Sequence, residues 1–134
     1  MKNLLLSPSA FWPKGAALVR ILYGVFLVYH SLQMFNGEDM KGMGQWLADE
    51  GYPMPLIFAY AGKVSELLGG LLMIGGLYTR LAGATLFVTF MMITFTLGHG
   101  LIFTEDQHPF MFGLFALHYL FAGPGEWSLD NGRK

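Results

Sequence analysis

The chain of 134 residues contains no cysteine. This absence excludes disulfides, thiolate nucleophiles, CxxC redox pairs, thiolate zinc sites and cysteine-ligated iron–sulfur clusters. The sequence also contains no recognisable flavin, nicotinamide or metal motif. Any electrons that this protein handles must therefore pass through a bound cofactor or a partner.

Charged residues are scarce at 13% of the chain, whereas a soluble domain carries about 25%. Hydrophobic residues make up 54% and aromatic residues 16%. A chain of this size has too much surface to hide so many apolar side chains in water. The composition therefore predicts a membrane protein, with the lipid bilayer as its solvent. The formal net charge of −1 indicates no basic surface for nucleic acid.

Four apolar segments predict four membrane-spanning helices, at residues 16–35, 56–78, 81–100 and 109–122. Crossing the hydrocarbon takes about 20 residues, and the first three segments are long enough. The apolar run at residues 4–6 is too short for a cleavable signal peptide, so the first span is expected to be an uncleaved anchor. We therefore expect an all-α integral membrane four-helix bundle, with residues 1–134 as a single domain.

The connection between the first two spans contains apolar residues at helical spacing. Met40, Met43 and Leu47 recur at i, i+3 and i+7, with Trp46 alongside and Gly51 as a C-terminal stop. This pattern predicts a short amphipathic helix at the outer interface. The alternative is a loop with three chance apolar contacts.

Positive charges indicate the orientation in the membrane. They gather at the two termini and in the turn between the second and third spans, whereas the other two connections are acidic. By the positive-inside rule, both termini are then cytoplasmic. The residues in the first group are Lys2, Lys14, Arg20, Arg80, Arg133 and Lys134.

Glu66 is the most informative residue, because an ionisable group inside the bilayer costs about 2.5–3.5 kcal/mol even on a lenient scale. It lies near the middle of the second predicted span, and Gly62 and Gly70 share its helix face. A neighbouring helix can therefore approach closely beside the carboxylate. Two interpretations stay open: a structural carboxylate held by an arginine, or a site residue that contacts a ligand or accepts a proton.

Other polar residues lie on the predicted helix faces near Glu66. Arg20 and His30 share one face of the first span, and Arg20 could either extend to the cytoplasmic interface or reach inward to Glu66. Lys63 lies one turn outward from Glu66, and His99 ends a threonine-rich stripe on the third span. A lone histidine in a membrane helix is more often a packing residue than a ligand.

The histidines and the outer loop also raise the options of a haem and a metal. His30 and His99 lie at comparable depths, but no haem-specific pattern surrounds them. Glu105, Asp106 and His108 cluster in the last outer connection without a recognised ligand spacing. We expect a solvated loop there, and neither haem nor metal.

Together these features resemble the DoxX family of small four-helix bacterial membrane proteins, over about residues 18–130. Arg20, Gly24 and His30 in the first span contribute, as does the approach GYPMP at residues 51–55. The strongest segments are ELLGGLL at residues 66–72, GGLYTR at 75–80 and GPGEWSLD at 123–130.

The resemblance implies a multi-pass protein of the bacterial inner membrane, connected with quinone-linked oxidoreductases. Under a first hypothesis, the chain is a subunit that lines a quinone site, with Glu66 and His30 as proton-exchanging residues and Arg20 and His99 as further contacts. A protein partner would carry the redox centre. Under a second hypothesis, it is a non-catalytic anchor or scaffold of a larger redox complex. A homo-oligomer is compatible with both.

The orientation can be tested with a reporter that is active only outside the cytoplasm. Because the acidic connection between the first two spans is expected outside, alkaline phosphatase inserted near Asp49 should be active. The same enzyme fused after Lys134 should be inactive. Phosphatase activity at the C-terminal fusion would contradict the predicted orientation.

Overall fold

The computed structural model describes residues 7–8, 12 and 14–133. The run at residues 4–6, Lys2 and Lys134, which entered the predictions above, lie outside this part. Within it the chain is all-helical, with five α-helices and no strand. Three helical segments, Gly15–Phe35, Pro55–Gly75 and Thr79–Leu97, are long and apolar enough to cross a membrane.

Local backbone preferences set the ends of the first two long helices. Helix α1 (Gly15–Ser31) continues as a 3-10 turn over Leu32–Phe35. Helix α3 (Pro55–Gly75) starts with proline, whose fixed φ suits a helix start. It ends at Gly76, which takes the left-handed conformation at φ 63°. The helix is therefore shorter than the predicted segment, which ran to residue 78.

The second half of the chain begins with α4 (Thr79–Met92), which continues as a π-helical turn over Ile93–Leu97. This helix ends before the predicted residue 100, because Gly98 is extended. Helix α5 (Gln107–Ala122) has 16 residues, or about 24 Å at 1.5 Å per residue. That is shorter than the roughly 30 Å of hydrocarbon, so the fourth span stays a prediction.

Helix α2 (Gly37–Asp49) occupies the connection where the sequence predicts an amphipathic helix. The Asn36 side chain caps its start by accepting the N–H of Glu38. Met40 and Leu47 are buried on one face, in a cluster with Ala59 of α3. The expected apolar stripe therefore packs against the protein.

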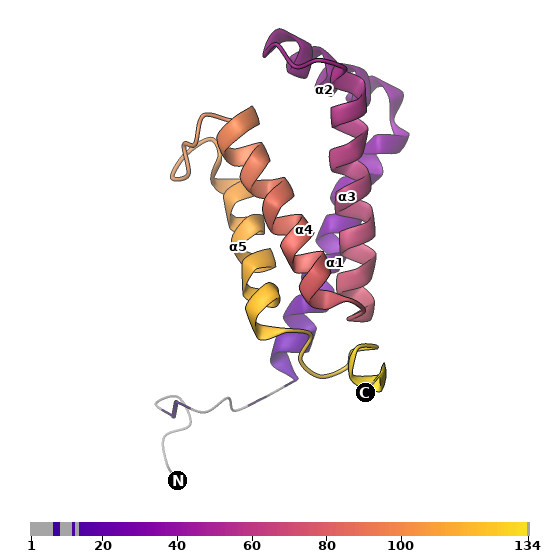
Figure 1. Cartoon of the computed structure of the whole chain (residues 1–134), viewed down its shortest axis with the longest axis vertical. Helices are drawn as coiled ribbons and strands as arrows, with labels where there is room; N and C mark the ends of the chain where they lie inside the picture. Colours follow the sequence, from indigo (N-terminus) through magenta and orange to yellow (C-terminus); the bar gives the residue numbers. More distant parts are fainter. Residues whose placement is uncertain (1–6, 9–11, 13, 134) are drawn as a thin grey trace.

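Two helix pairs form the body of the molecule: α1 packs on α3, α4 packs on α5, and α3 contacts α4. Figure 1 shows the pairs converging near the C-terminus and separating toward the other end, where α2 lies. Glycines allow the backbones of α1 and α3 to come into close contact. A Cβ at Gly24 of α1 would lie 2.6 Å from the carbonyl oxygen of Gly70 on α3. Gly70 therefore has the role predicted for it, whereas a Cβ at Gly62 would meet no atom within 4 Å.

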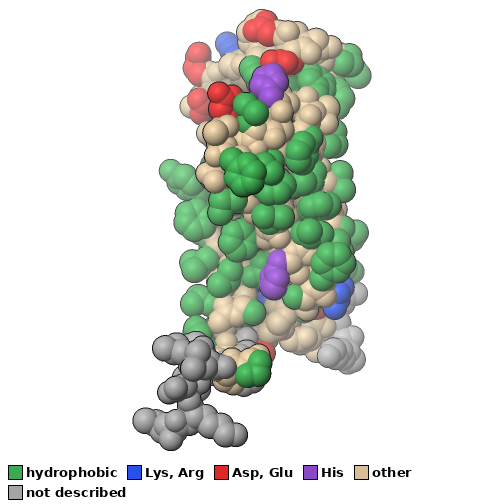
Figure 2. Space-filling model, turned by 90° about the vertical axis from the view of Figure 1, so that its left-hand side faces the viewer, with side chains coloured by type: hydrophobic (Ala, Val, Ile, Leu, Met, Phe, Trp, Pro, Cys, Tyr) green, Lys and Arg blue, Asp and Glu red, His purple; other side chains and the backbone are tan. Residues whose placement is uncertain are grey.

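The outer surface of the helices is largely apolar. In Figure 2, hydrophobic side chains cover the middle of the face shown, and acidic side chains gather at its upper end. Phe26 and Leu81, for example, are 61% and 64% exposed. Such a surface is suited to contact with lipid. The buried hydrophobic residues form a core toward the converging end of the helices. That core contains Tyr23, Leu27, Met73, Ala82, Leu86, Phe90, Ala116 and Tyr119.

Arg20 is fully buried at this end and does not pair with Glu66. Its guanidinium donates instead to backbone carbonyls of α3 and the C-terminal segment 123–130. Nε donates to Met73 O at 2.8 Å and Nη2 to Trp127 O at 2.7 Å. Nη1 donates to the carbonyls of Pro124 and Glu126. The Arg20–Glu66 pair considered from the sequence is therefore wrong, because the returning C-terminal segment takes up the guanidinium.

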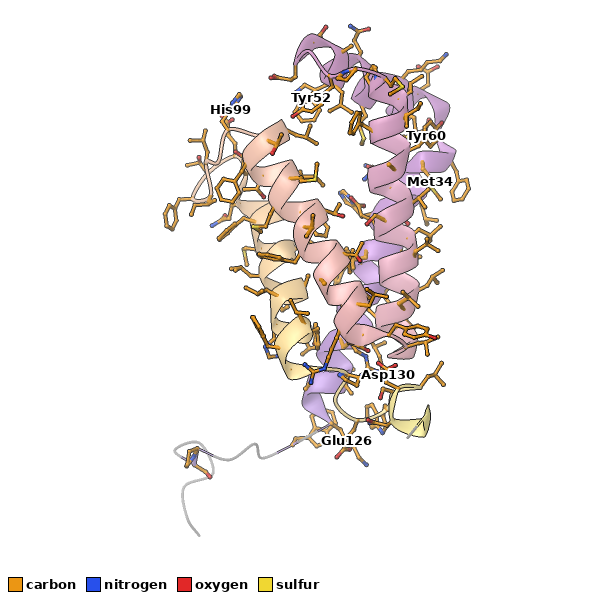
Figure 3. All side chains as sticks on the ribbon, in the orientation of Figure 1. Met34, Tyr52, Tyr60, His99, Glu126 and Asp130 are labelled. Carbon is orange, nitrogen blue, oxygen red and sulfur yellow. The ribbon has the colours of Figure 1, made fainter. Side chains whose placement is uncertain are left out.

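The same segment is fastened to the start of α4 by Asp130. Its carboxylate accepts the backbone N–H groups of Tyr78 at 2.7 Å and Thr79 at 2.9 Å. Figure 3 shows Asp130 and Glu126 together at this end of the molecule. The C-terminal segment thus closes the converging end of the helices.

Replacing Arg20 by lysine tests this closure. Lysine keeps the charge but loses the planar fork of donors, so several carbonyls lose their partner. We expect Arg20→Lys to cost about 2–4 kcal/mol of stability, measured by thermal unfolding in detergent. The matched control is Arg80→Lys, since exposed Arg80 also donates to two carbonyls. Equal losses in the two variants would refute a special role for Arg20.

Candidate functional site

Glu66 lies near the middle of α3, is 3% exposed and contacts two basic groups. Its Oε2 lies 3.1 Å from His30 Nδ1 and 3.3 Å from Lys63 Nζ. Lys63 Nζ lies in turn 3.1 Å from His30 Nδ1. These three side chains form a closed triangle, which we call the Glu66 cluster.

The sequence builds this cluster from two helices. Lys63 and Glu66 are three residues apart on α3, so their side chains share one helix face. His30 comes from the end of α1, which the Gly24–Gly70 contact holds against α3. Lys63 is 4% exposed, whereas the His30 side chain is 46% exposed. A buried ion pair is therefore joined by an accessible imidazole.

The imidazole of His30 has two ways to complete this arrangement. A protonated Nδ1 donates to Glu66 Oε2, whereas an unprotonated Nδ1 accepts from the Lys63 ammonium. One nitrogen of a neutral ring cannot do both at once. Since both patterns fit the same positions of the heavy atoms, the cluster can shift a proton without moving a helix.

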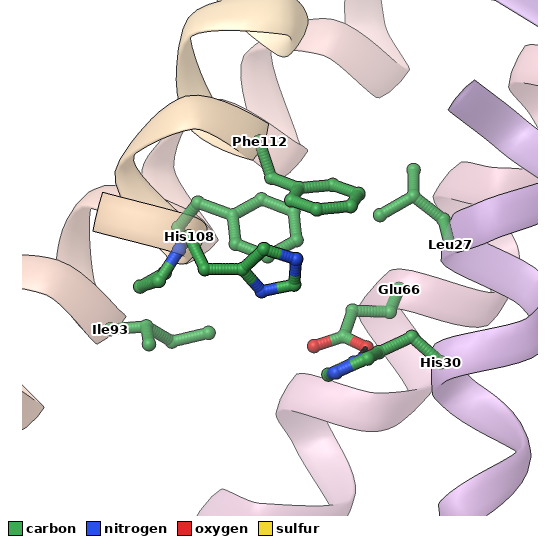
Figure 4. Close-up of a pocket in the computed structure, with 8 residues that line it drawn as sticks. Leu27, His30, Glu66, Ile93, His108 and Phe112 are labelled. Atoms are coloured by element: carbon green, nitrogen blue, oxygen red, sulfur yellow. Dashed lines mark hydrogen bonds and ion pairs between the residues drawn. The ribbon is translucent and has the colours of Figure 1, made fainter. Parts of the chain in front are cut away.

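A cavity of about 150 Å³ lies against the cluster, and we call it the inner cavity. It lies between α1, α3, α4 with its π-helical turn, and α5, and Figure 4 shows its lining. Its walls are aromatic and aliphatic, with a carboxylate and two imidazoles as the polar groups. The lining residues are Leu27, His30, Glu66, Phe90, Ile93, His108, Pro109 and Phe112.

His108 is the second imidazole, and sequence analysis placed it in a loop with Glu105 and Asp106. The structure places it in the first turn of α5, where it faces the inner cavity. Its ring centroid lies 6.2 Å from that of His30 and 4.8 Å from that of Phe112. The i, i+4 spacing of His108 and Phe112 is the signal that could have placed both on the inner face.

Two other predicted site residues lie elsewhere. His99 is exposed after the π-helical turn, and its backbone N–H donates to Asp106 Oδ2. Figure 3 shows it at the outer edge of the molecule. Arg20 is held by the C-terminal segment. The structure therefore brings Glu66 and His30 together, adds Lys63 and His108, and leaves Arg20 and His99 apart.

Comparisons with known proteins cover the helices that carry the cluster. The DoxX family model matches residues 15–99, which include His30, Lys63 and Glu66 but not His108. The Bacillus subtilis (strain 168) protein named "Putative oxidoreductase CatD" is 32% identical over 97 residues. The match covers 72% of this chain and 64% of that protein, so the chain spans less than two thirds of the relative's length. No solved structure matches the chain.

Replacing Lys63 by methionine should leave the Glu66 carboxylate buried without its cation. We expect a loss of about 3–5 kcal/mol, measured by thermal unfolding in detergent. The double variant Lys63→Met, Glu66→Gln should recover much of that loss, because the two residues are directly coupled. The control Lys41→Met changes an exposed lysine of α2 and should leave the melting temperature unchanged. Additive losses in the double variant would show that Lys63 and Glu66 do not act as a pair.

Proposed function

The chain belongs to the DoxX family of membrane proteins, and on that premise we propose that it is a membrane subunit of a quinone-linked oxidoreductase system. The quinone ring would occupy the inner cavity. The observation that carries this proposal is the lining: apolar walls on which Glu66, His30 and His108 converge. Such a composition is typical of sites for small organic ligands. The oxidoreductase name of the Bacillus relative supports a redox role.

The size of the inner cavity agrees with one ring. A core cavity of about 150 Å³ is large enough to hold benzene, and the inner cavity has this volume. Phe90 and Phe112 would contact the ring. Because the centroids of His30 and His108 lie 6.2 Å apart, both imidazoles can approach one carbonyl oxygen. They lie too close together to bind the two opposite oxygens.

The chemistry required of this site is proton exchange. Reduction of a quinone to a hydroquinone takes two electrons and two protons, and forms an O–H bond at each carbonyl oxygen. The electrons would come from a partner protein that carries a flavin or metal centre. His30, backed by Glu66, or His108 is suited to give one of the two protons to the oxygen that both imidazoles approach, or to accept it in the reverse reaction. The opposite oxygen would take the second proton from a donor outside this pair.

The proposal includes the placement in the membrane. We place α1, α3, α4 and α5 across the bacterial inner membrane as a four-helix bundle, with both termini in the cytoplasm. Helix α2 then lies at the opposite interface, and the apolar outer surface faces lipid. A second copy of the chain could pack on that surface.

A non-catalytic anchor or scaffold is the second candidate. It is favoured by the way the structure satisfies its buried charges internally: Glu66 by Lys63, and Arg20 by carbonyl groups. A scaffold needs these contacts but no ligand in the inner cavity. Ligand binding therefore separates the two candidates.

Binding of a short-chain ubiquinone to the purified protein, measured by calorimetry in detergent, tests the proposed site. Glu66→Gln keeps the shape but not the charge, and should weaken binding about tenfold, the equivalent of about 1.4 kcal/mol. His30→Ala should weaken it similarly, because it removes a wall of the cavity. The matched control is His118→Ala, which changes an exposed histidine of α5 outside the cavity lining.

Two results would favour the scaffold. One is the absence of quinone binding to the folded wild-type protein. The other is equal affinity in the wild type, Glu66→Gln and His30→Ala. Thermal unfolding of each variant would confirm that the protein tested is folded.

A further inference from the structure

A second and larger cavity, of about 560 Å³, lies on the other side of the Glu66 cluster. It extends between α2, α3 and the π-helical turn toward the α2 end of the molecule, and we call it the vestibule. His30, Glu66 and Ile93 line both the vestibule and the inner cavity. The cluster therefore stands between the two spaces.

The vestibule lining becomes less exposed from its mouth to its floor. Glu38 and Asp39, exposed in the first turn of α2, lie at the mouth. Gly42 and Gly62 lie further along the lining, and a Cβ at either would meet no atom within 4 Å. Buried Lys63 and Glu66 form the floor. The rest of the lining is mostly apolar, from Met43, Trp46, Leu47, Phe58, Ala59, Ile93 and Leu97. The charged groups at the mouth and on the floor nevertheless offer polar partners to water in a cavity of this volume.

The opposite end offers no comparable route within the described part of the chain. Between the cluster and the C-terminal segment lie the fully packed residues Leu27 and Met73, which are 1% and 0% exposed. Arg20 and the carbonyl groups around it close the end itself. Water can therefore approach Glu66 from the α2 end.

We infer that the vestibule is a water-filled path through which the Glu66 cluster exchanges protons with the aqueous phase at the α2 end. A proton from water binds Glu66 Oε2 and passes over 3.1 Å to His30 Nδ1. The ring then releases a proton from its other nitrogen toward the inner cavity, which the same ring lines. Lys63 is a positioning residue, since its ammonium contacts both the carboxylate and Nδ1. That these protons serve a quinone rests on the proposed function, but the water path itself does not.

The absence of cysteine makes accessibility directly measurable, because any introduced thiol is the only one in the chain. We would compare Gly62→Cys in the vestibule with Val64→Cys, which lies two residues away on α3 and is 42% exposed on the apolar outer surface. Lys41→Cys marks the water-exposed side of α2. The probe is a cationic, membrane-impermeant methanethiosulfonate, applied to sealed proteoliposomes from either side.

We expect Gly62→Cys to react from the same side as Lys41→Cys and not from the other. Val64→Cys should react at least about 100-fold more slowly, because lipid suppresses the thiolate that reacts. An unreactive but folded Gly62→Cys would overturn the inference, as would reaction from the side opposite Lys41→Cys. Equal reaction of Gly62→Cys and Val64→Cys would also overturn it, since the vestibule would then differ in no way from the outer surface.

Charge selectivity gives a second readout that does not depend on quinone. Glu38, Asp39 and Glu66 outnumber Lys63 in the lining, while His30 and the nearby His108 add positive charge only when protonated. The vestibule should therefore concentrate cations. At Gly62→Cys the cationic reagent should react several-fold faster than an anionic one, and Glu38→Gln with Asp39→Asn should reduce that ratio. A ratio unaffected by these changes would contradict entry through the acidic mouth. Failure of quinone binding would leave these results intact.

Discussion

The buried carboxylate of Glu66 is the constraint on which the central part of this structure depends. An ionised group in an apolar helix must find a partner within reach, or the helix cannot stay in a medium without water. Lys63 provides that partner one turn away on the same helix. His30 completes the arrangement from α1, which requires the close approach of α1 and α3 that Gly24 and Gly70 allow.

Arg20, the second buried charge, is satisfied by a different kind of group from those that satisfy Glu66. Arg20 is surrounded by carbonyl oxygens, including that of Met73 in the last turn of α3, where the helix dipole is negative. Since backbone carbonyls have no proton to give, this contact is fixed and structural. Glu66, in contrast, meets an imidazole whose nitrogen can donate or accept. The converging end of the helices is therefore closed by fixed contacts, while the middle of α3 contacts an imidazole that can donate or accept a proton.

The sequence was informative about which residues are unusual and less so about how they pair. Apolar runs predicted the helices, and the cost of charge in lipid singled out Glu66 and Arg20. The possible pairing of Arg20 with Glu66 was wrong. Helical periodicity shows which residues share a helix face but not which side chains on different elements meet, and it could not show that the C-terminal segment packs over Arg20. His108 was missed because Pro109 was taken as the start of its helix, which begins at Gln107. Lys63 was noted one turn from Glu66 but not as its partner, although an opposite charge three residues away in an otherwise apolar helix favours that pairing.

A site for a lipid-soluble redox ligand has to meet two phases, since such a ligand dissolves in the bilayer and protons are supplied by water. Under the proposed function, the division of the helices into two separating pairs would provide access to both (Figure 1). The inner cavity is bounded by apolar side chains of α1, α4 and α5, whereas the vestibule combines apolar side chains of α2 and α3 with the charged residues Glu38, Asp39 and Lys63. His30 and Glu66 are the polar residues common to the two linings. In the proposed path, a proton that crosses from one space to the other would pass through Glu66, whose burial the fold already has to satisfy, and through His30. The structural constraint and the proposed chemistry would then fall on the same carboxylate.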